Sequence, residues 1–484
     1  MSVPSHGRAA ITSKSWKLFL VCQAVCVLGA GWGLWRGDPR VAVVSLAFLP
    51  QLLLWFFLVG EEQRLLVFIA SLLPFTGLEL LPVSYALWVL YFGTMGTLLF
   101  LHVTRFTLSA IPSPGLTPRE RGPLLAFGVS VVVAALNAAS RGWGSSSMLV
   151  SSVRALEMLL AAWFFGVVPQ SLGQVRVLMY AMGAAIGLTG VGAFLVPTAV
   201  GEGGLLGGKA VQGLFAVVNL NALATIVASL CMVVVGAMLD TRRTSVRVGL
   251  AVVTFILLAA LLYTRSRGAW LGFGVAVLYF LVRSRSRAFV LFSAMCFLLL
   301  FSLDIFRVSL TSRIGATSAQ DPSLWGRFVL WAFAAKVVKA NWLLGVGMEN
   351  FGSVKYVFGY PFPRAATLGY NAHNLYLELL ADLGIIGLLA FVSALGGALF
   401  SLDRLVRRGA SKVNGGFLAL GLAGGLIAYS THGLLDSLTW HHGAFMLLGV
   451  MLGLAASLRR LAGDSKRASA QRPGMDPAGA QIAR

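Results

Sequence analysis

The stretch LGIIGLLAFVSALGGALFSL, from Leu383 to Leu402, runs for 20 residues without a charged side chain. At a rise of about 1.5 Å per residue, a helix of this length crosses a hydrocarbon core roughly 30 Å thick. The whole chain of 484 residues has the same character, since 58% of its residues are hydrophobic and only 11% are charged. This composition lies far outside that of soluble globular domains and indicates a polytopic, all-α integral membrane protein.

Further apolar runs of similar length predict a bundle of about 12 to 14 transmembrane helices. The predicted spans cover residues 17–35, 41–59, 64–81, 83–103, 122–139, 149–168, 175–197, 212–238, 248–263, 268–282, 288–305, 383–402, 414–435 and 442–458. The four cysteines fall inside these spans without CxxC spacing, so we expect neither a disulfide framework nor a zinc site.

The formal net charge of +21 is compatible with a nucleic-acid partner, but its distribution indicates membrane topology instead. With both termini in the cytoplasm, most basic residues outside the spans fall in the inner loops, as the positive-inside rule requires. These are Arg105, Arg119, Arg121, Arg242, Arg243, Arg247, Arg283, Arg285, Arg287, Arg404, Arg407, Arg408 and Lys412. We therefore expect membrane lipids and no nucleic acid as partners, and a disordered cytoplasmic tail over residues 463–484.

The loop over residues 306–382 is the longest between predicted spans, and it lies on the outer side. Its segment LWGRFVLWAFAAKVVKANWLL, residues 324–344, carries apolar residues at helical spacing with Arg327 among the charges on other faces. This pattern predicts an amphipathic helix at the membrane surface, which ends before Gly345. Such a loop suits either the roof of an active site or a structural cap over the bundle.

The end of this loop, YNAHNLYLELLAD over residues 370–382, places polar side chains at the mouth of the opening span. Ionisable groups there are costly to keep near lipid, which favours a functional site. Imidazole takes a proton readily near neutral pH, so His373 is a candidate general base. Asn374, Glu378 and Asp382 follow on one helical face, where they either orient the site or cap the helix.

The sequence TRSRGAWLG, from Thr264 to Gly272, places Arg265 and Arg267 at an outer helix boundary, against the positive-inside rule. A guanidinium group offers paired donors that match phosphate oxygens, which favours a phosphate-binding role. The alternative is that both side chains extend to lipid headgroups.

Two other pairs of ionisable residues stand out. Arg154 and Glu157 lie one turn apart within a predicted span, and we expect them to pair with each other. His432 and Asp436 lie one turn apart near an outer helix end, at a spacing that a metal ion tolerates. Without a third fixed ligand we predict no metal site there.

In this order, these elements resemble those of the O-antigen ligase and polymerase family. The shared elements are an SRG sequence at Ser266, Arg267 and Gly268, then Arg327 and Trp331, then GVGMENF over residues 345–351, then His373 and Asn374, and finally LGIIG from Leu383. The resemblance covers about residues 209–440. One departure is Lys209, where family members often have an arginine; lysine keeps the charge but loses the bidentate fork.

The resemblance implies a GT-C-like glycosyltransferase that moves a glycan from undecaprenyl pyrophosphate to an acceptor hydroxyl. It implies inversion at the sugar, no metal or other cofactor, and an active site on the periplasmic face of a bacterial inner membrane. The implied donor-binding residues are Lys209, Arg265, Arg267 and Arg327, the implied base is His373, and the supporting residues are Asn374, Glu378, His432 and Asp436. The chain then divides into N-terminal helices (1–208), a catalytic region (209–440), a last helix (441–462) and a tail (463–484).

Several alternatives remain at this point. A ligase transfers the glycan to lipid A core, whereas a polymerase of the same family joins lipid-linked repeat units, and a third kind of relative glycosylates protein. A transporter or flippase of lipid-linked sugars is the rival from another class, because many helices with buried charge also suit alternating access. The long outer loop favours an enzyme.

Overall fold

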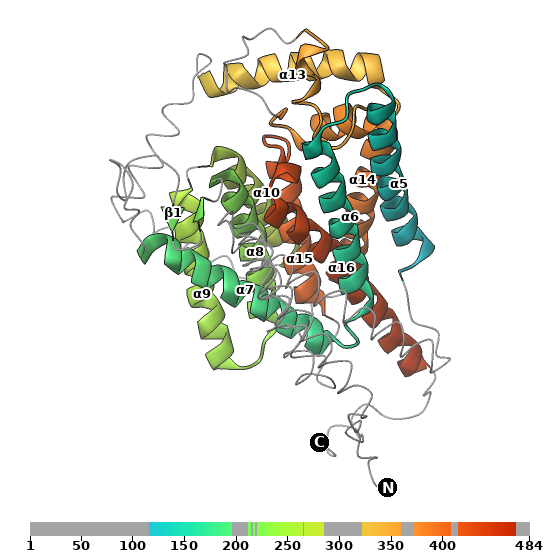
Figure 1. Cartoon of the computed structure of the whole chain (residues 1–484). Coiled ribbons are helices and arrows are strands. Elements are labelled where there is room, and N and C mark those ends of the chain that lie inside the picture. The colour runs from blue at the N-terminus through green and yellow to red at the C-terminus, as the bar shows by residue number, and fades with distance from the viewer. Residues whose placement is uncertain are drawn as a thin grey trace, which may run out of the picture.

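A computed structural model describes residues 116–195, 212–213, 216–217, 220–264, 266–284, 322–359, 371–407 and 415–470 of the chain. The described part is a bundle of helices with one helix laid across one end (Figure 1). The first four predicted spans, the span predicted at 288–305, Lys209 and Arg265 lie outside the described residues. Residues 471–484 of the tail predicted to be disordered lie outside them as well, whereas residues 463–470 are not disordered but extend the last helix.

The helices of the bundle follow the predicted spans closely. They are α5 (Pro118–Ser140), α6 (Ser146–Val167), α7 (Leu172–Leu195), α8 (Leu220–Asp240), α9 (Thr244–Tyr263), α10 (Arg267–Ser284), α14 (Leu375–Arg407), α15 (Gly416–His432) and α16 (His442–Ala470). Six of the described helices are long and apolar enough to cross a membrane. The prediction of an all-α, polytopic membrane protein is thereby confirmed.

The predicted start of the eighth span is wrong. Residues 212–217 do not open a helix but contain two short antiparallel strands, β1 (Gln212–Gly213) and β2 (Ala216–Val217), and α8 begins only at Leu220. Their apolar composition extended the hydrophobic run without specifying helical backbone, and composition alone does not separate a buried helix from a short strand.

Helices α8, α15 and α16 form the centre of the bundle. Helix α15 packs against α8 and α10, whereas α16 packs against α6 and α14, and α14 also packs against α5. The peripheral helices keep large apolar side chains exposed, among them Leu125, Leu136, Leu278 and Val282. Exposed apolar faces on helices whose backbone is satisfied internally are the expected exterior of a membrane protein.

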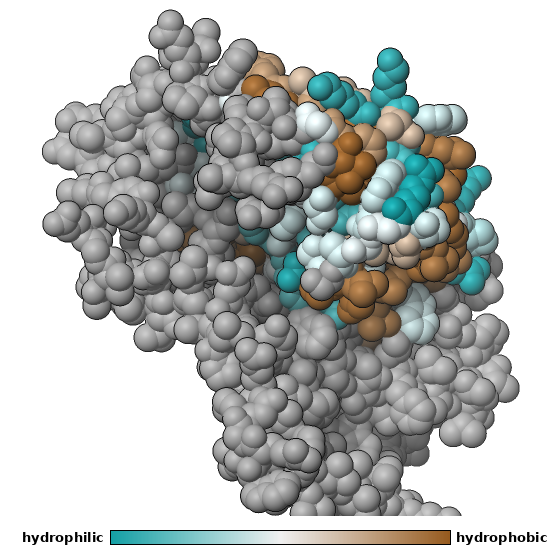
Figure 2. Space-filling view, turned by 45° about the horizontal axis from the view of Figure 1, so that its top comes forward, coloured by the Kyte–Doolittle hydropathy of each residue, from teal (hydrophilic) through white to brown (hydrophobic). Residues whose placement is uncertain are grey.

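Helix α13 (Pro322–Asn341) lies across one end of the bundle (Figure 1). It is the amphipathic helix predicted over residues 324–344, and it packs through Phe333 and Val337 on a small separate core that includes Phe351. The 3-10 helix η2 (Val354–Tyr356) belongs to the same layer. Figure 2 shows that hydrophilic and hydrophobic residues mix at this end, as expected where a protein meets both water and lipid headgroups.

Candidate functional site

The candidate site begins at a break in α14. Gly384 has φ 67° and ψ −173°, so the helix is interrupted there. The loop after α13 passes directly over the break: the Gly347 N–H donates to the carbonyl of Asp382 at 2.8 Å. A Cβ atom on Gly384 would lie 2.1 Å from the carbonyl oxygen of Leu343, and one on Gly345 would lie 2.2 Å from that of Asp382. Backbone meets backbone here, and only glycine permits the contact.

The carboxylate of Asp382 binds the backbone of this loop. Its Oδ2 accepts the Glu349 N–H at 2.6 Å and its Oδ1 accepts the Phe351 N–H at 3.1 Å, and the side chain is buried. Asp382 therefore fixes the GVGMENF segment rather than facing an open cleft.

The two other polar residues predicted on this helical face order the chain around His373. The Asn374 Oδ1 accepts the N–H groups of Tyr376 and Leu377 at 3.1 and 3.0 Å, which caps the start of α14. Glu378 is buried, and it accepts the Ala372 N–H at 3.1 Å and the indole N–H of Trp440. The two residues thus combine both predicted roles, since Asn374 caps the helix and Glu378 fixes the segment that carries His373.

His373 itself lies between these anchors in a left-handed backbone conformation, with φ 46°. Its N–H donates to Asn371 Oδ1 at 3.1 Å, and its Nδ1 lies 2.9 Å from Asp436 Oδ1. The His373 side chain is 37% exposed whereas that of Asp436 is 3% exposed. A half-exposed imidazole backed by a buried carboxylate is the arrangement of a general base and its orienting partner.

Asp436 is held in its ionised form. Burial alone would raise its pKa, but the hydrogen bond and charge of His373, together with the charges of His432 and His441, lower the pKa of Asp436 to about 2. An ionised carboxylate only accepts hydrogen bonds, so Nδ1 of His373 carries the proton that it shares with Asp436. In the neutral imidazole the Nε2 atom is then left with its lone pair for a substrate.

His432 lies inside the bundle, against the turn that precedes α10. Its buried ring has Nδ1 2.7 Å from Thr225 Oγ1 and Nε2 3.4 Å from Ser266 Oγ, and a Cβ on Gly268 would lie 2.7 Å from its Cδ2. It therefore holds the SRG turn that opens α10 with Arg267. Among the described residues no group of three or more His, Cys, Asp or Glu side chains is arranged to hold a metal ion.

The two described arginines of the predicted donor site come from different elements. Arg267 is the first residue of α10, next to the turn that His432 holds, and Arg327 lies on α13; both are half-buried. The charge of Arg327 acts on the ring of His432, which places α13 and the SRG turn in one neighbourhood. The indole N–H of Trp331 donates to the Ala372 carbonyl at 3.0 Å and so fixes α13 beside His373.

The order of these elements along the chain is also that of a known family, because residues 250–392 match the family model described as O-antigen ligase. This stretch of the chain is similar to O-antigen ligases. The match runs from α9 through the SRG turn, α13 and His373 into α14, and it confirms the predicted resemblance. No curated protein matches the chain. O-antigen ligases are membrane enzymes of lipid-linked glycan assembly, so the similarity implies lipid-linked glycan substrates in a membrane environment.

Asp436 lies outside the stretch that matches the family model, yet it is the hydrogen-bond partner of His373, which lies inside that stretch. The sequence had placed Asp436 with His432, four residues away, and had not joined it to His373, 63 residues away. The missed contact depends on the turn after α15, where the Leu375 N–H donates to the carbonyls of Gly433 and Asp436 at 2.7 and 3.1 Å. No local signal in the sequence specifies that turn.

The predicted pair of Arg154 with Glu157 is wrong. Arg154 Nη1 lies 3.9 Å from Glu349 Oε2, whereas Glu157 Oε2 lies 3.2 Å from His442 Nε2. The spacing within α6 allows the local pair, but the two side chains meet partners from different elements that pack on the helix. The side chains of Glu349 and His441 were not predicted as part of the site, although GVGMENF and the pair of histidines after Trp440 contain them.

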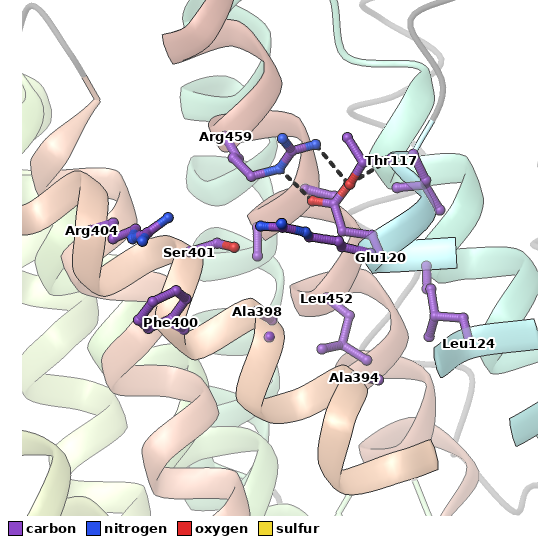
Figure 3. Close-up of a pocket in the computed structure, with 16 residues that line it drawn as sticks. Thr117, Glu120, Leu124, Ala394, Ala398, Phe400, Ser401, Arg404, Leu452 and Arg459 are labelled. Atoms are coloured by element: carbon purple, nitrogen blue, oxygen red, sulfur yellow. Dashed lines mark hydrogen bonds and ion pairs between the residues drawn. The ribbon is translucent and has the colours of Figure 1, made fainter. Parts of the chain in front are cut away.

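The described residues also enclose a cavity of about 310 Å³ at the opposite end of α14 (Figure 3). Its walls are mostly apolar, and at its rim Arg459 makes two hydrogen bonds with Glu120, at 2.6 and 2.7 Å. It contains none of the residues of the candidate site.

Proposed function

We propose that this protein transfers a glycan from undecaprenyl pyrophosphate to an acceptor hydroxyl on the periplasmic face of a bacterial inner membrane, as an O-antigen ligase. The observation that carries this proposal is the contact between the half-exposed His373 and the buried Asp436, next to the SRG turn and beneath α13. The similarity to O-antigen ligases supplies the substrate class, and the dyad supplies a group that can deprotonate a hydroxyl.

In the proposed step, Nε2 of His373 takes the proton of the acceptor hydroxyl while its oxygen attacks the anomeric carbon of the donor. The new C–O glycosidic bond forms as the bond from the anomeric carbon to the phosphate oxygen breaks, and the pyrophosphate leaves with that electron pair. Asp436 stabilises the imidazolium through Nδ1. Attack from the side opposite the leaving group inverts the configuration of the sugar.

The departing pyrophosphate needs positive charge, and we assign this role to Arg267 and Arg327. Guanidinium groups bind phosphate oxygens in pairs and stabilise charge as it develops. His432 positions Arg267 through Ser266, and Trp331 positions Arg327 by fixing α13. Arg265 and Lys209 are proposed to add to the same binding surface, with Lys209 the weaker contact because it has no fork.

The test is product formation by purified protein in detergent with a lipid-linked glycan donor and a lipid A core acceptor. We expect the wild-type protein to form the new glycosidic bond without a membrane compartment, which a transporter cannot do. We expect His373→Ala to lose about 10²- to 10⁴-fold in rate, the usual contribution of a general base, with membrane insertion unchanged. A His373→Ala rate near that of the wild type would contradict the proposal.

The acceptor separates the ligase from a polymerase. In a strain that lacks the protein, the ligase proposal expects long lipid-linked chains without attachment to lipid A core. Single-unit glycans alone would identify a polymerase.

A further inference from the structure

Arg154 on α6 lies at the edge of the candidate site with much of its hydrogen-bonding capacity unused. Its nearest acidic partner is Glu349 Oε2, 3.9 Å from its Nη1, and its side chain is 32% exposed. It makes no hydrogen bond to any residue that the structure describes, although guanidinium carries five N–H donors. A half-buried guanidinium in this state is prepared to receive an anion.

Glu349 does not depend on Arg154 for its position. Its carboxylate accepts a hydrogen bond of 2.5 Å from Ser151, and its backbone N–H donates to Asp382. The backbone at Glu349 is left-handed, with φ 53°, and the side chain is buried. Glu349 is thus held in place by its own bonds and lies beside Arg154 without using its donors.

Arg154 and the proposed donor-binding arginines approach the site from opposite flanks. The charge of Arg154 acts on His441, whereas the charge of Arg327 acts on His432, and Asp436 acts on both rings. The packing agrees with this order, because Arg154 lies on α6 against α16, whereas Arg267 begins α10 against α15. The dyad of His373 and Asp436 therefore lies between two separate groups of positive charge.

This order assigns the two flanks to different substrates. In an inverting displacement the nucleophile approaches from the side opposite the leaving group. With pyrophosphate at Arg267 and Arg327, the acceptor enters from the flank of Arg154. We propose that Arg154 binds a negatively charged group of the acceptor glycan, a phosphate or a carboxylate, and so determines which acceptor the enzyme takes. The assignment rests on the proposed function.

The experiment measures KM for the acceptor and for the donor separately, in Arg154→Gln, Arg154→Lys and wild-type protein. The acceptor probe is a lipid A core oligosaccharide used in three forms: untreated, treated with phosphatase, and amidated at its carboxylates. We expect Arg154→Gln to raise KM for the untreated acceptor about 10- to 100-fold, as loss of a charge-assisted contact does, with KM for the donor unchanged. The treatment that raises the wild-type KM identifies the anionic group.

Two controls keep the result specific. Lys339→Gln removes an exposed positive charge from α13 and should leave both KM values unchanged. Arg154→Lys keeps the charge without the fork, so its KM should lie between those of the wild type and Arg154→Gln, and it replaces the latter if that variant does not fold. Wild-type protein that forms no product contradicts the proposed function itself. If wild-type protein forms product, an unchanged acceptor KM in the Arg154 variants, or a rise in donor KM alone, overturns only the role of Arg154.

Discussion

His373 has a strained, left-handed backbone, and this backbone determines the direction in which its ring points. A non-glycine residue in this region costs about 1–3 kcal/mol, which the surrounding structure must offset. The bonds from the His373 N–H to Asn371 and from Nδ1 to Asp436 do so, and the capped start of α14 follows at once. This backbone places the half-exposed imidazole beside a buried carboxylate, where the proposed acceptor can reach it.

Asp436→Asn tests whether the carboxylate sets the tautomer of His373. An asparagine amide can donate to Nδ1, which places the proton on Nε2 and removes the lone pair that the hydroxyl needs. We expect kcat to fall about 10²- to 10⁴-fold, with KM for the donor nearly unchanged. Initial rates at saturating donor would measure this. A variant with the wild-type kcat would show that Asp436 has only a structural role.

Glu349 predicts a pH dependence of stability. Burial raises the pKa of Glu349 from its ordinary value of 4.5 to about 7. The hydrogen bond from Ser151 and the charge of Arg154 act in the opposite direction but do not cancel the effect of burial. Between pH 4.5 and 7 the unfolded chain loses this proton while the folded protein keeps it, so the contribution of Glu349 to stability falls as the pH rises. Above the folded pKa the contribution stays constant.

Thermal unfolding in detergent at pH 5 and pH 8 measures this effect in wild-type protein and in Glu349→Gln. Glutamine has the shape of the protonated acid and does not titrate, so we expect a smaller loss of Tm between the two pH values in the variant. The nearby Glu378 and Asp382 also titrate and feel the charge of Glu349, so the difference between the two proteins measures Glu349 together with its coupling to these two groups. Equal pH dependence in both would exclude it as the source.

At the scale of elements, the loop after α13 crosses α14 at its break, and this close contact requires glycine at position 384. Gly384→Ala adds a methyl group 2.1 Å from the Leu343 carbonyl at a positive φ, and the loop must move. We expect a loss of more than about 3 kcal/mol, measured as a fall in Tm and in detergent-stable yield. Gly396→Ala in the same helix is the matched control, since no atom lies within 4 Å of its added Cβ.

Alanine has the higher helix propensity, so Gly396→Ala should be neutral or slightly stabilising. A Gly384→Ala protein as stable as this control would mean that the loop after α13 moves away from α14 at little cost in free energy. The Asp382 side chain would then not hold the loop rigidly.

The sequence predicted the elements better than their interruptions. Apolar runs near 20 residues predicted the long helices of the bundle, because a hydrocarbon core sets both length and composition. The break at Gly384 was not predicted, since α14 also contains Gly387, Gly396 and Gly397 and nothing local separates them. The break depends on a loop that begins about forty residues earlier, and that contact has no signature in the apolar pattern.

At the scale of the whole molecule, the sequence likewise predicted which residues belong to the site but not how they are arranged. His373 and Arg267 were predicted from their types and from the outer side on which they fall, and Arg327 was predicted from the family resemblance. The contacts of Asp436 with His373 and of Ser266 with His432 were not predicted, because they form only through the packing of α14, α15 and α10. Topology can be predicted from composition, whereas pairing across the bundle needs the fold.

The two ends of the bundle also differ in charge. Arg404 and Arg459 lie at the cavity beyond the end of the apolar part of α14, opposite α13, and Glu120 pairs with Arg459 (Figure 3). An arginine-rich end agrees with the predicted cytoplasmic side, and the proposed function places the end with His373 in the periplasm. The proposed reaction requires that orientation, because Arg267 and Arg327 are assigned to a donor presented outside the cytoplasm.

Cysteine labelling tests the orientation directly. In a background with the native cysteines replaced, Ser353→Cys introduces an exposed thiol after α13, and Ser245→Cys introduces an exposed thiol near the start of α9. Both substitutions are nearly isosteric, so they form a matched pair. We expect a membrane-impermeant maleimide to modify Cys at 353 in intact spheroplasts and Cys at 245 only after detergent is added. The reverse pattern would place His373 in the cytoplasm, and the proposed donor and acceptor could then not reach it from the periplasm.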